Sequence, residues 1–118
     1  MTTSEPVKRV EIGCPGHLIV ASFCHWRRHT RVSGYRISTV GDYYQRGIKG
    51  RQTVGLGRYF ETMVFRITGE ATDVESCGCG DADFSEIDFE GYNTAGAAQA
   101  GHEQMVEKYL AIANEEKT

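Results

Sequence analysis

Residues 58–67, with the sequence RYFETMVFRI, constrain the fold of this chain more than any other stretch. This run is the longest one rich in aromatic and β-branched residues, a composition that favours a β-strand. Because alternate side chains of a strand point to opposite faces, the run has two candidate packing faces. One face holds Phe60, Thr62, Val64 and Arg66, and the other, more apolar face holds Tyr59, Glu61, Met63, Phe65 and Ile67. Either set can be the packed one.

The same strand separates two oppositely charged halves of the chain. Residues 1–66 contain 11 Lys and Arg against 4 Asp and Glu, whereas residues 67–118 contain 2 against 12. The overall net charge of −3 therefore combines a basic half with a strongly acidic one. A slightly negative total argues against a dedicated nucleic-acid binder, but the basic half keeps that function open.

Weaker strand patterns lie on both sides of this run, at 17–23, 35–40 and 84–89. We expect 17–23 and 35–40 to pair as an antiparallel ribbon. Residues 95–113 have the periodicity of an amphipathic helix. Strands followed by one helix predict an α+β fold, a small antiparallel β-sheet with one C-terminal amphipathic α-helix packed across it.

The length of 118 residues fits one domain with a modest core. We expect a flexible N-terminal arm over 1–13, ending in a short extended piece, and a single α+β domain over 14–118. No stretch approaches the roughly 20 apolar residues of a membrane helix. The first residues lack the apolar segment of a secretion signal, so we expect a protein that is not secreted by a signal peptide.

The expected helix can be capped by Asn93 or Thr94, whose side-chain oxygens can accept from free N–H groups of the first turn. His102 lies within its apolar stripe, where we expect a core residue with one hydrogen bond. Gly96 and Gly101 each cost roughly 1 kcal/mol relative to Ala, and close packing against the sheet would explain them. The stripe consists of Ala98, His102, Met105, Tyr109 and Ile112, widened by Val106, Leu110 and Ala113.

Acidic residues are concentrated between positions 81 and 90. The spacing does not fit an EF-hand, which needs a glycine at the sixth loop position and a glutamate at the last. In a strand over 84–89, Asp88 and Glu90 would point to solvent with Glu86, while Ile87 and Phe89 would be the core candidates. We therefore expect this acidic face to be solvated.

Cysteine and histidine form the sharpest chemical pattern in the sequence. Cys14 and His17 flank a Pro-Gly turn, and Cys77 and Cys79 lie in a glycine-rich segment. Three cysteines and one histidine are a usual ligand set for structural zinc. The alternative is that these are reduced thiols in turns, with Cys24 as a small buried residue. The four residues are thus a candidate site for a structural Zn²⁺.

A second candidate site is basic and aromatic. Its cations can attract phosphates or a negatively charged protein, and its aromatic rings can stack on bases. Alternatively, the charges face the acidic half within the fold, or water. The candidate partner-binding or nucleic-acid-binding residues are Trp26, Arg27, Arg28, Arg31, Tyr43, Tyr44, Arg46, Lys49 and Arg51.

Three stretches together resemble a family of small uncharacterised proteins of tailed bacteriophages and prophages. They are GYRISTVGDYY in 34–44, RYFETMVF in 58–65, and YNT with GHEQMVEKY in 92–109. CPGH at 14–17 and CHWRRHT at 24–30 have the same character. The resemblance covers about residues 14–110 and implies a phage origin and a small α+β domain, without an activity to transfer.

These patterns favour binding over catalysis. Gly55 and Gly57 lack the third glycine and the following helix of a dinucleotide site, and no Walker, HExxH or GxSxG motif occurs. We expect a phage-encoded, non-enzymatic interaction protein, either a virion accessory component or a host-directed effector, in the host cytoplasm or the virion. The alternative is a zinc-stabilised nucleic-acid-associated protein that uses the basic half.

Overall fold

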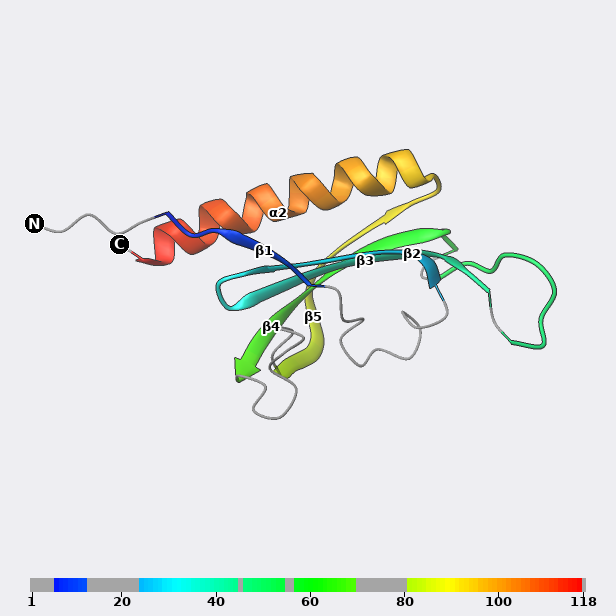
Figure 1. The fold of residues 1–118 in the computed structure, drawn as a ribbon, viewed down its shortest axis with the longest axis horizontal. Helices are drawn as coiled ribbons and strands as arrows, with labels where there is room; N and C mark the ends of the chain where they lie inside the picture. Colours follow the sequence, from blue (N-terminus) through cyan, green and yellow to red (C-terminus); the bar gives the residue numbers. More distant parts are fainter. Residues whose placement is uncertain (1–5, 13–23, 45, 55–56, 70–80, 118) are drawn as a thin grey trace, which may run out of the picture.

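A computed structural model shows five strands and one long helix (Figure 1). It describes residues 6–12, 24–44, 46–54, 57–69 and 81–117. The elements are β1 (Arg9–Ile12), β2 (Cys24–Val32), β3 (Tyr35–Tyr43), β4 (Phe60–Gly69), β5 (Asp81–Tyr92) and α2 (Ala95–Lys117). This arrangement confirms the predicted α+β fold with an antiparallel sheet and a C-terminal helix.

The strands lie in the sheet in chain order, β1-β2-β3-β4-β5, and each pairs antiparallel with the next. β1 places Glu11 opposite Thr30 of β2. The sheet therefore begins within the segment that the sequence predicts as an N-terminal arm. β4 lies between β3 and β5, so the middle strand is β3 rather than the run that dominates the sequence.

The partner of β3 differs from the one that the sequence predicts. β2 has the sequence CHWRRHTRV, and Arg28 lies opposite Thr39 of β3. Five of its nine residues are Arg or His, so the segment lacks the apolar pattern of a typical strand. The expected strand at 17–23 lies outside the described residues, and the prediction that it pairs with β3 was wrong.

The helix α2 lies across β2, β3 and β4 on one face of the sheet (Figure 1). Its first turn is capped by Thr94, whose Oγ1 accepts from the Ala97 N–H at 3.1 Å. It continues beyond the predicted end at residue 113. The main core cluster joins the sheet residues Val32, Tyr35, Ile37 and Val64 to the helix residues Met105, Val106, Tyr109 and Ala113.

The helix packs on the less apolar face of β4. Val64 belongs to the main core cluster, and Thr62 on the same face is fully buried. Phe65, on the opposite face, is also buried, so both faces of β4 are covered. The polar Thr62 is accommodated under the helix because it joins a hydrogen-bond network centred on the helix.

At residues 87–89 the side chains of β5 depart from the prediction. Asp88 faces the helix, where its Oδ2 accepts from Lys108 Nζ at 2.6 Å and from the Tyr109 hydroxyl at 3.1 Å. Ile87, predicted as a core residue, is 43% exposed, and Phe89 is half-buried. The prediction failed at Asp88 because side chains of α2 bind it, whereas Glu90 on the same side is exposed as predicted. In the described part of the chain, no helix is long and apolar enough to cross a membrane.

Candidate functional site

A basic loop projects from the sheet between β3 and β4. Gln52 N–H donates to the Tyr43 carbonyl at 2.7 Å and closes the base of the loop. Gly47 and Gly50 have φ values of 82° and 88°, a backbone conformation that glycine adopts without steric cost. Figure 1 shows the loop extending beyond the end of the sheet. We call residue 44 and residues 46–54 the basic arm.

The tip of the basic arm presents both cationic and apolar side chains to solvent. Arg46 and Lys49 are exposed, and in the described part of the chain neither forms an ion pair. Tyr44 is 42% exposed and Ile48 is 47% exposed. Tyr44 also stacks on His25 of β2, with ring centroids 4.7 Å apart. An exposed mixture of this kind is typical of a contact surface.

Arg51 differs from the other two cations of the basic arm. Its guanidinium lies 3.2 Å from a carboxylate oxygen of Asp42 and 4.0 Å above the ring of Tyr59. Arg51 therefore ties the arm back to the sheet. Tyr43, another predicted contact residue, is half-buried and packs against the cluster of Cys24 and Val40.

Two of the predicted residues of β2, Arg28 and Trp26, are held within the fold and do not join the arm. Arg28 donates to Glu103 of α2 at 2.6 Å and to Glu11 of β1 at 3.0 Å. Trp26 is half-buried and packs edge-on against Phe60 at 5.9 Å between ring centroids. Arg27 and Arg31 alternate with these residues and so belong to the opposite face. Of the predicted set, Tyr44, Arg46, Lys49 and Arg51 lie on the basic arm, where Arg51 is held by Asp42.

The predicted zinc ligands Cys14, His17, Cys77 and Cys79 lie outside the described residues, so zinc binding there stays a prediction. Within the described part of the chain, no group of three His, Cys, Asp or Glu residues is placed to hold a metal ion. Cys24 is buried, and burial raises the pKa of its thiol to about 11. Its thiol is therefore protonated at neutral pH.

A buried polar network crosses the interface between helix and sheet, and sequence reasoning missed it. His102 of α2 is fully buried, with Nε2 2.8 Å from Thr30 Oγ1 and Nδ1 2.6 Å from Thr39 Oγ1. Thr39 Oγ1 is in turn 2.5 Å from Thr62 Oγ1. The histidine thus makes two hydrogen bonds rather than the predicted one. Burial, followed by the charge of Arg28, lowers the pKa of His102 to about 4.

A charged cluster closes the network at the β1 side. Glu11 accepts from the Thr30 hydroxyl at 3.1 Å, and both Arg9 and Arg28 bind Glu11 and Glu103. The hydrogen bond from Arg9 is the main cause that lowers the pKa of Glu103 to about 2. The cluster therefore joins the first strand, β2 and the helix, and it neutralises two cations of the basic half.

A second buried histidine lies on the other face of the sheet. His29 Nδ1 is 3.0 Å from Ser38 Oγ, which also accepts from Arg36 Nε at 2.9 Å. His29 Nε2 is buried and has no hydrogen-bond partner among the described residues. Burial, with Arg36 next, lowers the pKa of His29 to about 3, so the imidazole is neutral at ordinary pH.

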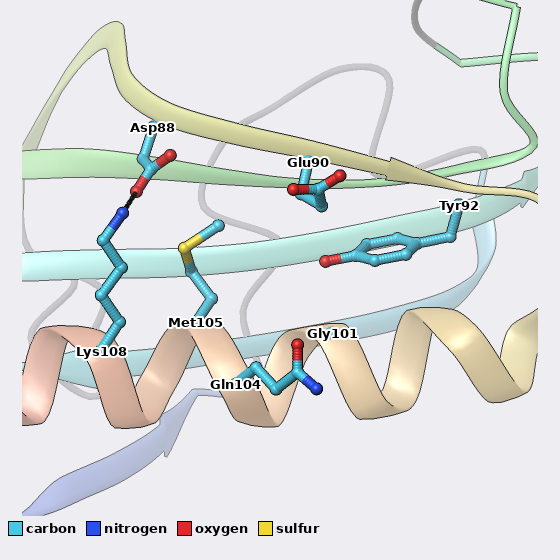
Figure 2. Close-up of a pocket in the computed structure, with 7 residues that line it drawn as sticks. All are labelled: Asp88, Glu90, Tyr92, Gly101, Gln104, Met105 and Lys108. Atoms are coloured by element: carbon cyan, nitrogen blue, oxygen red, sulfur yellow. Dashed lines mark hydrogen bonds and ion pairs between the residues drawn. The ribbon is translucent and has the colours of Figure 1, made fainter.

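An open groove of about 200 Å³ lies between β5 and α2 (Figure 2). Alternate residues of the strand, Asp88, Glu90 and Tyr92, line one side. Tyr92 lies so close to Gly101 that a Cβ there would be 2.1 Å from the phenol ring. The close packing predicted for Gly101 is thus confirmed, whereas a Cβ at Gly96 would meet nothing within 4 Å. The helix side is lined by Gly101, Gln104, Met105 and Lys108.

The groove was not predicted from the sequence because acidic residues at alternate positions of β5 are also typical of a strand face that points to solvent. Its signal in the sequence is the glycine inside the helix, which admits the Tyr92 ring.

Comparisons of the whole chain add no assignment, since it matches no protein-family model, no curated protein and no solved structure. The function must therefore be argued from the surfaces themselves.

Proposed function

We propose that this chain is a small phage-encoded, non-enzymatic binding protein whose basic arm docks onto an acidic surface of a protein partner. The observation that carries the proposal is the composition of the arm tip. Arg46 and Lys49 are exposed there beside Ile48, which is 47% exposed. The described cations Arg9, Arg28 and Arg51 are held in ion pairs instead.

The anchoring of the arm supports a role in recognition. The Gln52 amide donates to the Tyr43 carbonyl at 2.7 Å, Arg51 lies over the ring of Tyr59, and the Gln52 side chain donates to the Gly50 carbonyl at 3.2 Å. These contacts define the conformation of the loop before a partner arrives. A preorganised loop loses less conformational entropy on binding.

The same tip favours a protein partner over a nucleic acid. A nucleic-acid site needs several cations along a track, because each phosphate contact contributes through counterion release. Here Arg46 and Lys49 are the free cations of the arm, whereas Arg28 is held by Glu103 and Glu11. An exposed isoleucine between the two cations suits a protein surface, where apolar and charged contacts alternate.

A binding role also agrees with how the buried titratable groups are used. Both ring nitrogens of His102 are hydrogen-bonded to threonine hydroxyls, so they serve the fold rather than a substrate. The resemblance to phage proteins supports a phage origin. We therefore place the protein in the host cytoplasm or the virion, as an effector or an accessory component.

Site-specific cross-linking tests this function. A photoreactive amino acid replaces Ile48 at the arm tip, and in a control it replaces Glu107, an exposed residue of α2. Cross-linking in infected and uninfected host lysates, followed by mass spectrometry, should give a protein adduct from position 48 that position 107 does not give. The same adducts from both positions, or none from position 48, would contradict the proposal.

Filter binding separates the two classes of partner. The purified protein is titrated with single-stranded and double-stranded DNA and RNA over a range of salt concentrations. The proposal predicts no saturable binding at low salt. Tight binding with a steep salt dependence would show the nucleic-acid-associated alternative instead.

A further inference from the structure

The outer edge of β5 is the one long open edge of the described sheet. β5 has 12 residues and lies at the end of the strand order, whereas the opposite edge strand, β1, has four. No described strand lies beyond it. The outward backbone N–H and C=O groups of an edge strand can pair with another extended chain. Ile87 and Glu90 of this strand are exposed to solvent.

The groove lies beside this edge, on the helix side. Its strand side is made by Asp88, Glu90 and Tyr92, which alternate along β5. In an added strand, every second side chain would point to the same side as these residues and so into the groove. The intervening side chains would point to the other face, toward the exposed Ile87 and the half-buried Phe89.

The charges of the groove define what can enter it. Lys108 is bound to Asp88 at 2.6 Å, so the two compensate each other. Glu90 is exposed and has no bound cation among the described residues. Figure 2 shows Glu90 and the Tyr92 ring along the strand, with Met105 between strand and helix. A carboxylate beside an aromatic ring suits an ammonium or guanidinium group on an aliphatic stem.

The composition of β5 argues against pairing with a second copy of itself. The strand contains five acidic residues and no basic one, so two copies edge to edge would bring ten carboxylates together. Such repulsion protects an open edge from self-association. It also selects a partner strand that carries positive charge.

We propose that β5 is a docking edge for an extended peptide of alternating basic and apolar residues, which adds a sixth strand and inserts its basic side chains into the groove. The basic side chains contact Glu90 and the ring of Tyr92. The apolar side chains cover Ile87 on the other face. This site is separate from the basic arm and does not depend on its partner.

The test uses a synthetic heptapeptide, Val-Lys-Val-Lys-Val-Lys-Val, added to ¹⁵N-labelled protein. Amide shifts should change in residues 87–92 and 101–108, and hydrogen exchange should slow at every second amide of residues 87–92. The analogue with Glu in place of Lys should not bind. Shifts confined to other segments, or equal binding of the two peptides, would overturn the proposal.

Two modified peptides test the backbone pairing directly. One is N-methylated at its three Lys residues and the other at three of its Val residues. Because alternate amides of a strand point to opposite edges, only one of the two modified peptides should bind the protein more weakly, by at least about tenfold. Equal affinity of both modified peptides for the protein would refute strand addition.

A matched pair of protein variants tests the charge contact. Glu90→Gln removes the carboxylate at the groove, and Glu107→Gln removes an exposed carboxylate of α2 that does not line it. The first should weaken peptide binding about threefold to tenfold and the second should leave it unchanged. Equal effects of the two would count against the assigned site, since general acidity alone would then explain binding.

Discussion

Thr39 Oγ1 lies 2.6 Å from Nδ1 of His102, at the centre of the interface between helix and sheet. Thr30 Oγ1 is hydrogen-bonded to the other ring nitrogen at 2.8 Å, and Thr62 continues the series of hydrogen bonds from Thr39. A neutral imidazole has one donor and one acceptor, so one threonine hydroxyl donates to it and the other accepts. One helix residue thereby satisfies hydroxyl groups from two strands.

Replacing this histidine should be costly. His102→Leu removes one hydrogen-bond partner from each of two buried hydroxyls, which keep their bonds to Glu11 and Thr62, and a buried polar group left unsatisfied costs about 1–3 kcal/mol. We expect the free energy of unfolding, measured by urea denaturation, to fall by roughly 2–4 kcal/mol. The exposed His25→Leu should change it by less than about 0.5 kcal/mol. Similar values for the two variants would contradict the structural role of His102.

The two buried histidines predict that acid destabilises the fold at mild pH. Burial lowers the pKa of His102 to about 4 and that of His29 to about 3, whereas both titrate near 6.5 when unfolded. The unfolded state therefore binds more protons than the folded state below about pH 6.5, so stability falls as the pH drops toward 4.

Urea unfolding between about pH 7.5 and pH 5 measures this effect, and we expect a loss of a few kcal/mol. His29→Leu should reduce the slope of stability against pH, because one of the two groups is then absent. A stability that is constant over this range would show that the histidines do not resist protonation in the folded protein.

Two glycines of α2 form a matched pair for substitution. A Cβ at Gly101 would lie 2.1 Å from the Tyr92 ring, whereas one at Gly96 would meet nothing within 4 Å. Alanine stabilises a helix by up to about 1 kcal/mol relative to glycine. Gly96→Ala should therefore raise the midpoint of thermal unfolding, and Gly101→Ala should lower it. A rise for both variants would mean that Tyr92 does not pack on this position.

The ion pairs between β1 and α2 should couple the first strand to the helix. Arg9 donates to both carboxylate oxygens of Glu103, at 2.6 and 2.8 Å. Both side chains are partly exposed, so we expect a coupling energy of only about 0.5–1 kcal/mol. A double-mutant cycle of Arg9→Ala and Glu103→Ala measures it at low and high salt. Additive effects at low salt would show that the two residues act independently.

The sequence could predict the fold class and the helix because those signals are local. Thr94 and the apolar stripe from Ala98 to Ala113 define α2, and the aromatic and β-branched run gives β4. β2 was missed because the charge of Arg28 in this strand is compensated by Glu11 and Glu103, which lie 17 and 75 positions away from it in the sequence. Local sequence patterns do not show which distant carboxylates will pair with a cation in the folded protein.

The candidate site was predictable only in part, for the same reason. Arg46 and Lys49 lie within a glycine-rich loop, and local composition is enough to select them. The groove needs Glu90 on a strand and Met105 on the helix to face each other. Which side of β5 the helix covers depends on tertiary packing, and the acidic alternation is consistent with either answer.

The central claim is tested most directly by a binding measurement on a charge-reversed variant. The quantity measured is the affinity of the variant for the partner identified by cross-linking. Arg46→Glu combined with Lys49→Glu reverses the arm tip and leaves Arg51, which anchors the arm, unchanged. Lys8→Glu reverses an exposed charge in the segment before β1 and serves as the control. Like charges facing each other across an interface are strongly unfavourable, so the double variant should bind at least about tenfold more weakly, with the control within about twofold of wild type. Unchanged affinity of the double variant would contradict the assignment of the basic arm as the contact surface.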